Sequence, residues 1–157
     1  MDYAFVGGGN MGHALAAALI RHGVARPSQV LVVDPSAEAR RRAEALGCRT
    51  GEQVDAQLAG FRVLVLAVKP QSAAEALAPL KGRLEPRQVV VSIMAGVRIE
   101  TIQAALGHSA VVRVMPKAML YGRLATRWAG EPRASRTAGW SRCLPASTSI
   151  SSRCRLA

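Results

Sequence analysis

Apolar runs recur along the first 115 residues at a spacing typical of alternating strands and helices. Short, continuous β-branched runs predict strands that are buried on both faces, and stretches with apolar residues every three or four positions predict helices. The predicted strands are residues 3–6, 30–33, 63–68, 89–93 and 111–115, with a weaker candidate at 48–50. The predicted helices are residues 11–22, 36–46, 53–58, 72–80 and 99–106.

This order of elements predicts one folded α/β domain, which we place at residues 1–122. Strands separated by crossover helices pair in parallel, and right-handed crossovers make the sheet doubly wound. Gly23, Gly47 and Gly107 each follow a predicted helix, at the position where a left-handed residue commonly ends a helix. Local signals and the global pattern therefore agree over this part of the chain.

A glycine-rich turn joins the first predicted strand to the first predicted helix. Gly7, Gly9 and Gly12 occupy the three fixed positions of a G-x-G-x-x-G turn, which between a strand and a helix is typical of a dinucleotide site. Gly7 permits the sharp turn, Gly9 lets a pyrophosphate approach the backbone, and Gly12 lets the helix pack closely on the sheet. The N-terminus of the helix favours phosphate through its free N–H groups and its dipole. The sequence therefore predicts a Rossmann-type fold.

Asp34 ends the second predicted strand, close to the offset of roughly 20 residues at which a carboxylate meets the adenosine ribose hydroxyls. The alternative is that Asp34, followed by Pro35 and Ser36, starts a turn and caps the next helix. Residues 40–42 are three arginines, which either reach a 2′-phosphate or form the solvated face of a helix. The choice between NAD and NADP is left open.

Composition bears on the class of protein and its compartment. Half of the 157 residues are apolar, yet no run approaches the roughly 18 residues of a membrane span, and the N-terminus does not resemble a signal peptide. Cys48, Cys143 and Cys154 are far apart and lack metal-ligand spacing, which favours a reducing cytoplasm and no metal site. We therefore expect a cytoplasmic protein with no membrane partner.

The net charge of +11 comes mainly from the C-terminal residues. Residues 1–116 contain 13 Lys/Arg and 9 Asp/Glu, whereas residues 117–157 contain 8 Lys/Arg and one acid. Residues 123–157 are basic, rich in Arg, Ser and Ala, and without a helical or strand period, so that we expect a largely disordered tail. The tail lacks aromatic residues at stacking intervals, which disfavours nucleic acid as a partner.

Four blocks of residues 1–116 together resemble pyrroline-5-carboxylate reductase. They read Phe-Val-Gly-Gly-Gly-Asn-Met-Gly at 5–12, Ala-Val-Lys-Pro-Gln at 67–71, Ser-Ile-Met-Ala-Gly-Val at 92–97 and Val-Arg-Val-Met-Pro at 112–116. The resemblance implies an oxidoreductase of proline biosynthesis that reduces a cyclic imino acid, 1-pyrroline-5-carboxylate, to L-proline with NADP or NAD as its cofactor, and that forms a homo-oligomer. With Asp34, the cofactor-binding residues expected are Val6, Gly7, Gly8, Gly9, Asn10, Met11, Gly12, Ala67, Val68, Lys69, Pro70, Ala95 and Gly96.

Several of these residues have a second interpretation. Lys69 fits a solvated strand end equally well, Met11 fits a core position, and Ala95 with Gly96 fits an ordinary turn as well as a small-residue loop beside a nicotinamide ring. The three histidines have no partner in the sequence that favours catalysis, and we identify no catalytic residue. This suits hydride transfer, in which the cofactor carries the chemistry.

The resemblance ends after Pro116. The family continues with Asn-Thr-Pro and a helical domain that forms the dimer and most of the substrate pocket, whereas this chain has Lys117 and too few residues for that domain. We therefore expect a truncated reductase, and the abrupt loss of periodicity motivates the hypothesis of a shifted reading frame, which sequencing of the source gene tests. The alternative function is a non-catalytic NAD(P)-binding module.

Overall fold

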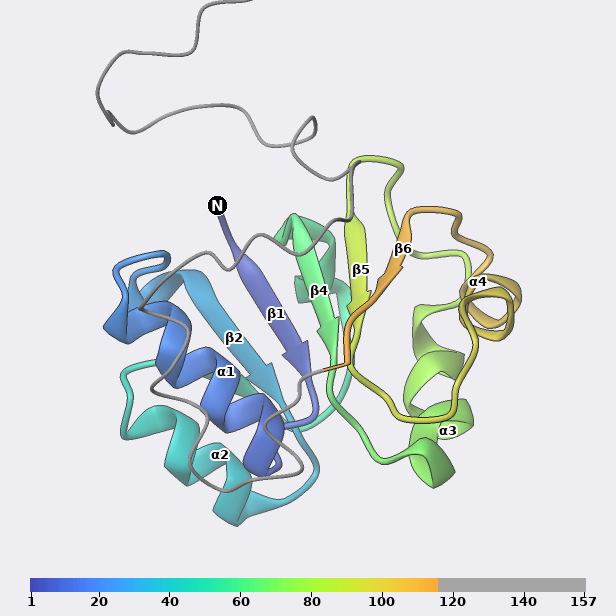
Figure 1. Cartoon of the computed structure of the whole chain (residues 1–157). Helices are drawn as coiled ribbons and strands as arrows, with labels where there is room; N and C mark the ends of the chain where they lie inside the picture. The colour runs from blue at the N-terminus through green and yellow to red at the C-terminus, as the bar shows by residue number, and fades with distance from the viewer. Residues whose placement is uncertain (116–157) are drawn as a thin grey trace, which may run out of the picture. The chain divides into compact units, whose positions relative to one another are not determined.

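The structure is a computed structural model that describes residues 1–115. Within this range six strands form one parallel sheet in the order β3-β2-β1-β4-β5-β6 (Figure 1). The strands are β1 (Tyr3–Val6), β2 (Val30–Val33), β3 (Arg49–Gly51), β4 (Val63–Leu66), β5 (Val89–Ser92) and β6 (Val111–Arg113). Phe5 of β1 aligns with Val32 of β2 on one side and with Val65 of β4 on the other, so the three central strands end level with one another.

Four α-helices and four short 3-10 helices connect these strands within the described chain. The α-helices are α1 (Asn10–Arg21), α2 (Ala37–Glu44), α3 (Ala73–Leu77) and α4 (Ile99–Leu106). The 3-10 helices are η1 (Pro27–Gln29), η2 (Ala56–Gly60), η3 (Pro70–Ser72) and η4 (Ala78–Leu80). Each connection between strands therefore contains a helical segment, as parallel pairing requires.

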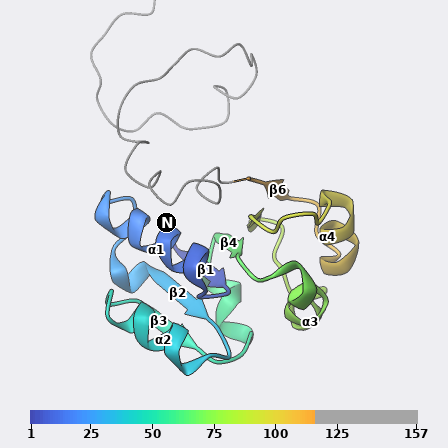
Figure 2. The same ribbon diagram turned by 60° about the horizontal axis from the view of Figure 1, so that its bottom comes forward.

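Helices α1 and α2 cover one face of the sheet over its first half, and α3 and α4 cover the opposite face over the other half. The chain adds β2 and β3 on one side of β1, and then β4, β5 and β6 on the other side, so right-handed crossovers place α1 and α2 on one face and α3 and α4 on the other. Figures 1 and 2 show α1 and α2 together over β1 and β2, away from α3 and α4. The strand order reverses between β1 and β4, which is where open α/β sheets bind ligands beyond their carboxyl ends.

Each face has its own apolar core, because alternate residues of a strand point to opposite faces. The core under α1 and α2 contains the buried side chains of Phe5, Ala16, Val30, Val32 and Ala43. The core under α3 and α4 contains the buried side chains of Leu64, Leu66, Leu77, Val90, Ile102 and Leu106. Burial of β1, β2 and β4 on both faces explains why these strands appear in the sequence as continuous apolar runs, whereas β3 and β6 at the edges of the sheet are not fully buried.

The structure confirms the α/β, doubly wound parallel sheet predicted from the sequence, with differences at element ends. Gly23, Gly47 and Gly107 adopt φ values of 68°, 78° and 65°, all in the left-handed region. Gly107 is the C-cap of α4 and Gly23 directly follows the C-cap of α1, whereas Gly47 lies in the turn after the C-cap of α2. The helix predicted at 53–58 is the 3-10 helix η2, and the one predicted at 72–80 is divided into η3, α3 and η4. Pro79 lies in η4 and has no N–H to donate, which explains why the α-helical pattern does not continue through it.

Two expectations fall wholly or partly beyond the described range. The last seven residues of the predicted 1–122 domain and the predicted tail at 123–157 lie outside it. Among residues 1–115, none of the helices has the length and hydropathy that a bilayer crossing requires.

Candidate cofactor site

The turn after β1 has a backbone that only glycine accommodates at its first position. Gly7 has φ of 105°, and its N–H donates to the carbonyl oxygen of Val33 at 2.8 Å. A Cβ added at Gly7 would lie 2.7 Å from the carbonyl carbon of Ala67 in the segment after β4. The turn is therefore held between the ends of β2 and β4, at the reversal of the strand order.

Gly12 brings the first turn of α1 against this loop. It is buried, and an added Cβ would collide with the carbonyl oxygen of Gly7 and would lie 3.2 Å from the Cβ of Ala67. The absence of a side chain at Gly12 thus allows the start of the helix to pack directly on the turn.

Gly9 differs from both, because space is open in front of it. The residue is exposed, and an added Cβ would meet no atom of the described chain within 4 Å. Gly9 is also the N-cap of α1, and no side chain of the described residues caps that end. The first N–H groups of α1 therefore have no side-chain acceptor among the described residues, as an anion site at a helix N-terminus requires.

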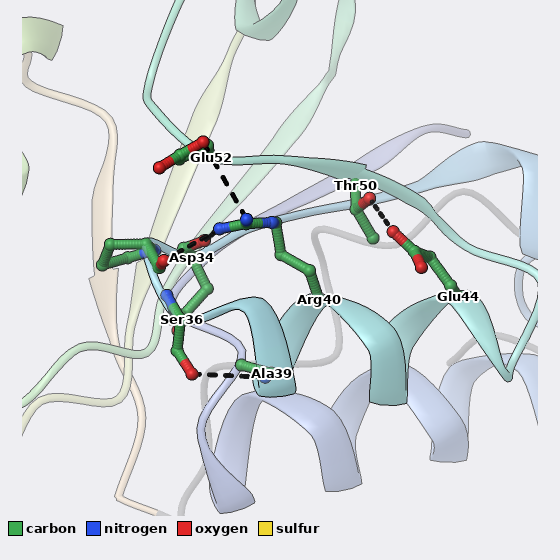
Figure 3. A network of polar contacts seen from close by, with 8 residues as sticks. Asp34, Ser36, Ala39, Arg40, Glu44, Thr50 and Glu52 are labelled. Carbon is green, nitrogen blue, oxygen red and sulfur yellow. Dashed lines mark hydrogen bonds and ion pairs between the residues drawn. The ribbon is translucent and has the colours of Figure 1, made fainter.

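Asp34 connects this turn with the end of β2. One carboxylate oxygen, Oδ2, accepts a hydrogen bond from the Gly8 N–H at 2.7 Å, and Oδ1 accepts one from the Ser36 N–H at 2.8 Å. The Ser36 hydroxyl in turn accepts from the Ala39 N–H at 3.4 Å and is the N-cap of α2 (Figure 3). Asp34 thus holds the glycine turn and the start of the turn after β2 through its two carboxylate oxygens, while Ser36 caps the N-terminus of α2.

The three arginines at 40–42 do not form one cluster. Arg40 Nη1 donates to the carbonyl oxygens of Asp34 and Pro35, each at 2.8 Å. Arg42 Nη1 donates to Oδ1 of Asn10 at 3.2 Å, next to the start of α1, and Arg41 is exposed. Two of the three therefore have specific partners, which the helical periodicity did not indicate.

The other expected site residues lie beyond the ends of β4 and β5. The Ala67 N–H donates to the Val6 carbonyl oxygen at 2.8 Å, so this segment begins directly beside the glycine turn. Val68 is half-buried, and Lys69 and Pro70 are exposed where η3 begins. Beyond β5, Ala95 is half-buried and Gly96 is exposed with φ of 75°. Both segments leave the sheet at the end where the glycine turn lies (Figure 1).

Met11 is half-buried at the start of α1, and His13 lies two residues further along the helix. The Nδ1 atom of His13 is buried and has no hydrogen-bond partner among the described residues. Burial of the imidazole, reinforced by the nearby Arg42 guanidinium, lowers the pKa of His13 from its ordinary value of 6.5. The folded protein therefore favours neutral His13, a feature that sequence inspection missed.

Sequence inspection also missed Gln88, which is only 1% exposed. Its Nε2 donates to the carbonyl oxygens of Leu58 and Phe61 at 2.8 and 2.7 Å, and its Oε1 accepts from the Glu85 N–H at 2.7 Å. These bonds tie the loop after η2 to the start of β5, away from the glycine turn. No group of three or more His, Cys, Asp or Glu within residues 1–115 is arranged to hold a metal ion.

The parallel sheet, the glycine turn at its reversal point and the carboxylate at the end of β2 define a dinucleotide-binding domain of the Rossmann class. Residues 2–96 match the family described as NADP oxidoreductase, coenzyme F420-dependent. The chain belongs to this family, and NADP or NAD is accordingly its class of cofactor.

Within this class the chain is similar to pyrroline-5-carboxylate reductases. It is 36% identical over 114 residues to the enzyme of Haemophilus influenzae, an alignment that covers 72% of this chain and 42% of the relative. The structure of the reductase from Coxiella burnetii superposes with a TM-score of 0.66 at 30% identity, covering 73% of this chain and 43% of that one. The reductase of Plasmodium falciparum, solved with NADP bound, has a TM-score of 0.61 at 25% identity and is covered to 42%, with 74% of this chain aligned.

The resemblance stated from the four sequence blocks is thereby confirmed at the level of the family. The chain spans about two fifths of the length of the relatives it matches, 42% in the Haemophilus enzyme and 43% in the Coxiella enzyme.

Proposed function

We propose that residues 1–115 bind NADP or NAD at the turn after β1 and form the cofactor half of a pyrroline-5-carboxylate reductase. The observation that carries this proposal is the hydrogen bond from the Gly8 N–H to Asp34 Oδ2. It joins the two separate parts of a dinucleotide fingerprint, the glycine turn and the acidic residue, into one continuous surface.

Each part of that surface suits one part of a dinucleotide. The open space at Gly9 and the uncapped N-terminus of α1 suit the pyrophosphate, because unpaired N–H groups bind anions. The Asp34 carboxylate suits the adenosine ribose, since each of its oxygens has acceptor capacity beyond the backbone bond it already makes. The segments at Ala67–Pro70 and Ala95–Gly96 are the candidates for contacts with the nicotinamide half.

The chemistry follows from this division of roles. A bound nicotinamide coenzyme supplies hydride, and the protein residues bind and orient it. In the proposed reaction that hydride reduces the imine of 1-pyrroline-5-carboxylate, giving L-proline. The relatives are more than twice as long as the segment they share with this chain, so the proposal for the chain as it stands has two parts, cofactor binding and turnover.

Both parts are tested on the same purified full chain. Titration with NADH and with NADPH, followed by enhanced nicotinamide fluorescence, measures binding. Addition of 1-pyrroline-5-carboxylate then measures oxidation of the coenzyme, with proline as the product assayed. Saturable binding with substrate-dependent oxidation supports the reductase, and absence of saturable binding of either coenzyme contradicts the proposal.

A second candidate is a dinucleotide-binding module without catalysis, because the matched family segment at residues 2–96 contains the glycine turn and Asp34, which are expected to bind the coenzyme. This candidate predicts saturable coenzyme binding but no proline formation in the same assay. A homo-oligomer belongs to the reductase proposal, and light scattering of the full chain with and without coenzyme tests it.

A further inference from the structure

The acidic residues around the β2–α2 loop bear on which coenzyme the proposed site prefers. This inference rests on the proposed function and concerns the adenosine end of the site. The family description names NADP, and the Plasmodium falciparum relative was solved with NADP. The charges of this chain instead favour a coenzyme without the 2′-phosphate.

Arg40 is the arginine that follows Asp34 most closely in the sequence, and its guanidinium hydrogen-bonds to the backbone of the loop between β2 and α2. Its Nη1 donates to the carbonyl oxygens of Asp34 and Pro35, each at 2.8 Å, and its side chain is 21% exposed. Figure 3 shows the guanidinium lying along the loop, with Glu52 on its other side. Nη1 of Arg40 is thus occupied by carbonyl oxygens of the protein itself, and Nη2 is paired with Glu52.

Glu52 reaches this place because of the sheet register. It directly follows β3, and the Asp34 N–H donates to the Gly51 carbonyl oxygen at 3.0 Å, which fixes the end of β3 beside the end of β2. Glu52 Oε2 lies 3.9 Å from Arg40 Nη2, with 67% of its side chain exposed. The pair adds little to stability at this exposure, yet it balances the Arg40 charge locally.

Neither Arg41 nor Arg42 is paired with the Asp34 carboxylate. Arg42 donates to Asn10 near the start of α1, and Arg41 is exposed on α2. Glu38 adds a further negative charge in the first turn of α2. The segments after β2 and β3 therefore present the carboxylates of Asp34 and Glu52, with Arg40 hydrogen-bonded to the first segment and paired with Glu52 of the second.

A 2′-phosphate and a 2′-hydroxyl respond to this arrangement in opposite ways. A phosphate monoester carries a charge of about −1.5 to −2 at neutral pH and would lie against carboxylates, which costs binding energy. A ribose hydroxyl can donate to a carboxylate oxygen, which strengthens binding. We propose that this site prefers NADH to NADPH and that Glu52, through its pairing with Arg40, is a specificity-determining residue outside the glycine motif.

The test compares dissociation constants of NADH and NADPH for the full chain and two variants. Glu52→Gln removes the charge beside Arg40. Glu44→Gln is the matched control, because Glu44 accepts a hydrogen bond from the Thr50 hydroxyl at 2.7 Å, on the strand that precedes Glu52, and its pairing does not involve Arg40 (Figure 3). Thermal unfolding of each variant verifies that it is folded.

We expect the unaltered chain to bind NADH about tenfold more tightly than NADPH, a ratio that falls as salt screens the charges. Glu52→Gln should tighten NADPH binding by about three- to tenfold and leave NADH binding nearly unchanged, while Glu44→Gln keeps the original ratio. Equal or tighter binding of NADPH by the unaltered chain, or an equal effect of the two variants, would overturn the inference while the proposed function stands. Failure of both coenzymes to bind would overturn the proposed function and this inference with it.

Discussion

Gly8 donates its backbone N–H to Asp34 Oδ2 at 2.7 Å, across 26 positions of the sequence. This bond joins the loop after β1 to the end of β2. The opposite carboxylate oxygen accepts from the Ser36 N–H, so that one side chain holds both the turn after β1 and the turn after β2. The same carboxylate that is expected to meet the ribose also holds the glycine turn in position.

The first prediction follows from this double role. Asp34→Ala removes both acceptors and leaves two N–H groups without their partner, which should lower the free energy of unfolding by about 1–3 kcal/mol. It should also weaken coenzyme binding by about tenfold or more, a loss of about 1.4 kcal/mol or more. Urea unfolding and coenzyme titration measure the two effects.

Ser36→Ala is the control for this variant. It removes only the α2 cap, with an expected cost of about 0.5–1 kcal/mol and little change in coenzyme affinity. Equal affinity of Asp34→Ala and the unaltered chain would show that Asp34 does not contribute to the site.

The second prediction concerns the close packing at Gly12. Gly12→Ala places a methyl group against the Gly7 carbonyl and the Ala67 side chain, which should cost about 1–3 kcal/mol of stability by overpacking. Gly60→Ala is the matched control, because an added Cβ there meets no atom of the described chain within 4 Å. If urea unfolding shows the same stability for both variants, the helix does not pack on the turn as described.

The third prediction tests Gln88, the buried amide that sequence inspection missed. Gln88→Ala removes the side-chain donor of the Phe61 carbonyl oxygen and the side-chain acceptor of the Glu85 N–H, and it opens a cavity, with an expected cost of about 3 kcal/mol. The Leu58 carbonyl oxygen keeps the Phe61 N–H as a donor. Gln103→Ala removes a single exposed bond to the Ser109 carbonyl oxygen and should cost less than about 1 kcal/mol. Denaturant midpoints that rank the two variants in the reverse order would contradict this role.

The fourth prediction is a pH dependence of stability that comes from His13. Burial, and then the Arg42 charge, lower the pKa of His13 in the folded state below 6.5, so the unfolded chain binds the proton more readily. Since stability rises with pH wherever the unfolded state holds more protons, this group makes the protein lose stability as pH falls below about 6.5. His13→Leu should reduce the loss of stability measured by thermal unfolding between neutral and mildly acid pH.

A profile that His13→Leu does not alter would show that His13 is not the responsible group.

The sequence predicted the inner strands of the sheet closely, because β1, β2 and β4 are short apolar runs that are largely buried on both faces. The strands at 3–6 and 30–33 agree with the structure at both ends. Helix ends were predicted less well where a single residue decides them, as Pro79 does in η4. Predicting the end of a helix requires knowing which backbone N–H groups find acceptors, and apolar periodicity does not contain that information.

The residues of the candidate site could be predicted from the sequence, but the hydrogen bonds between them could not. Glycine spacing placed the turn, and strand length placed Asp34 near it, yet the bond between Gly8 and Asp34 depends on the tertiary register of β1 and β2. The hydrogen-bond partners of Arg40 could not be predicted either, because helical spacing indicates the face of the helix on which a residue lies but not what its side chain contacts. Gln88 was missed because one polar residue before a strand has the same pattern as a loop residue.

The central claim is that a coenzyme's pyrophosphate lies against the backbone at Gly9, and the binding of NADH and NADPH to Gly9→Val tests it most directly. The Cβ atom added at Gly9 meets no atom of the described chain within 4 Å, so circular dichroism and the unfolding transition should change little. The account predicts a loss of coenzyme affinity of about 30-fold or more, equivalent to about 2 kcal/mol. An affinity equal to that of the unaltered chain in a folded Gly9→Val protein would contradict the account.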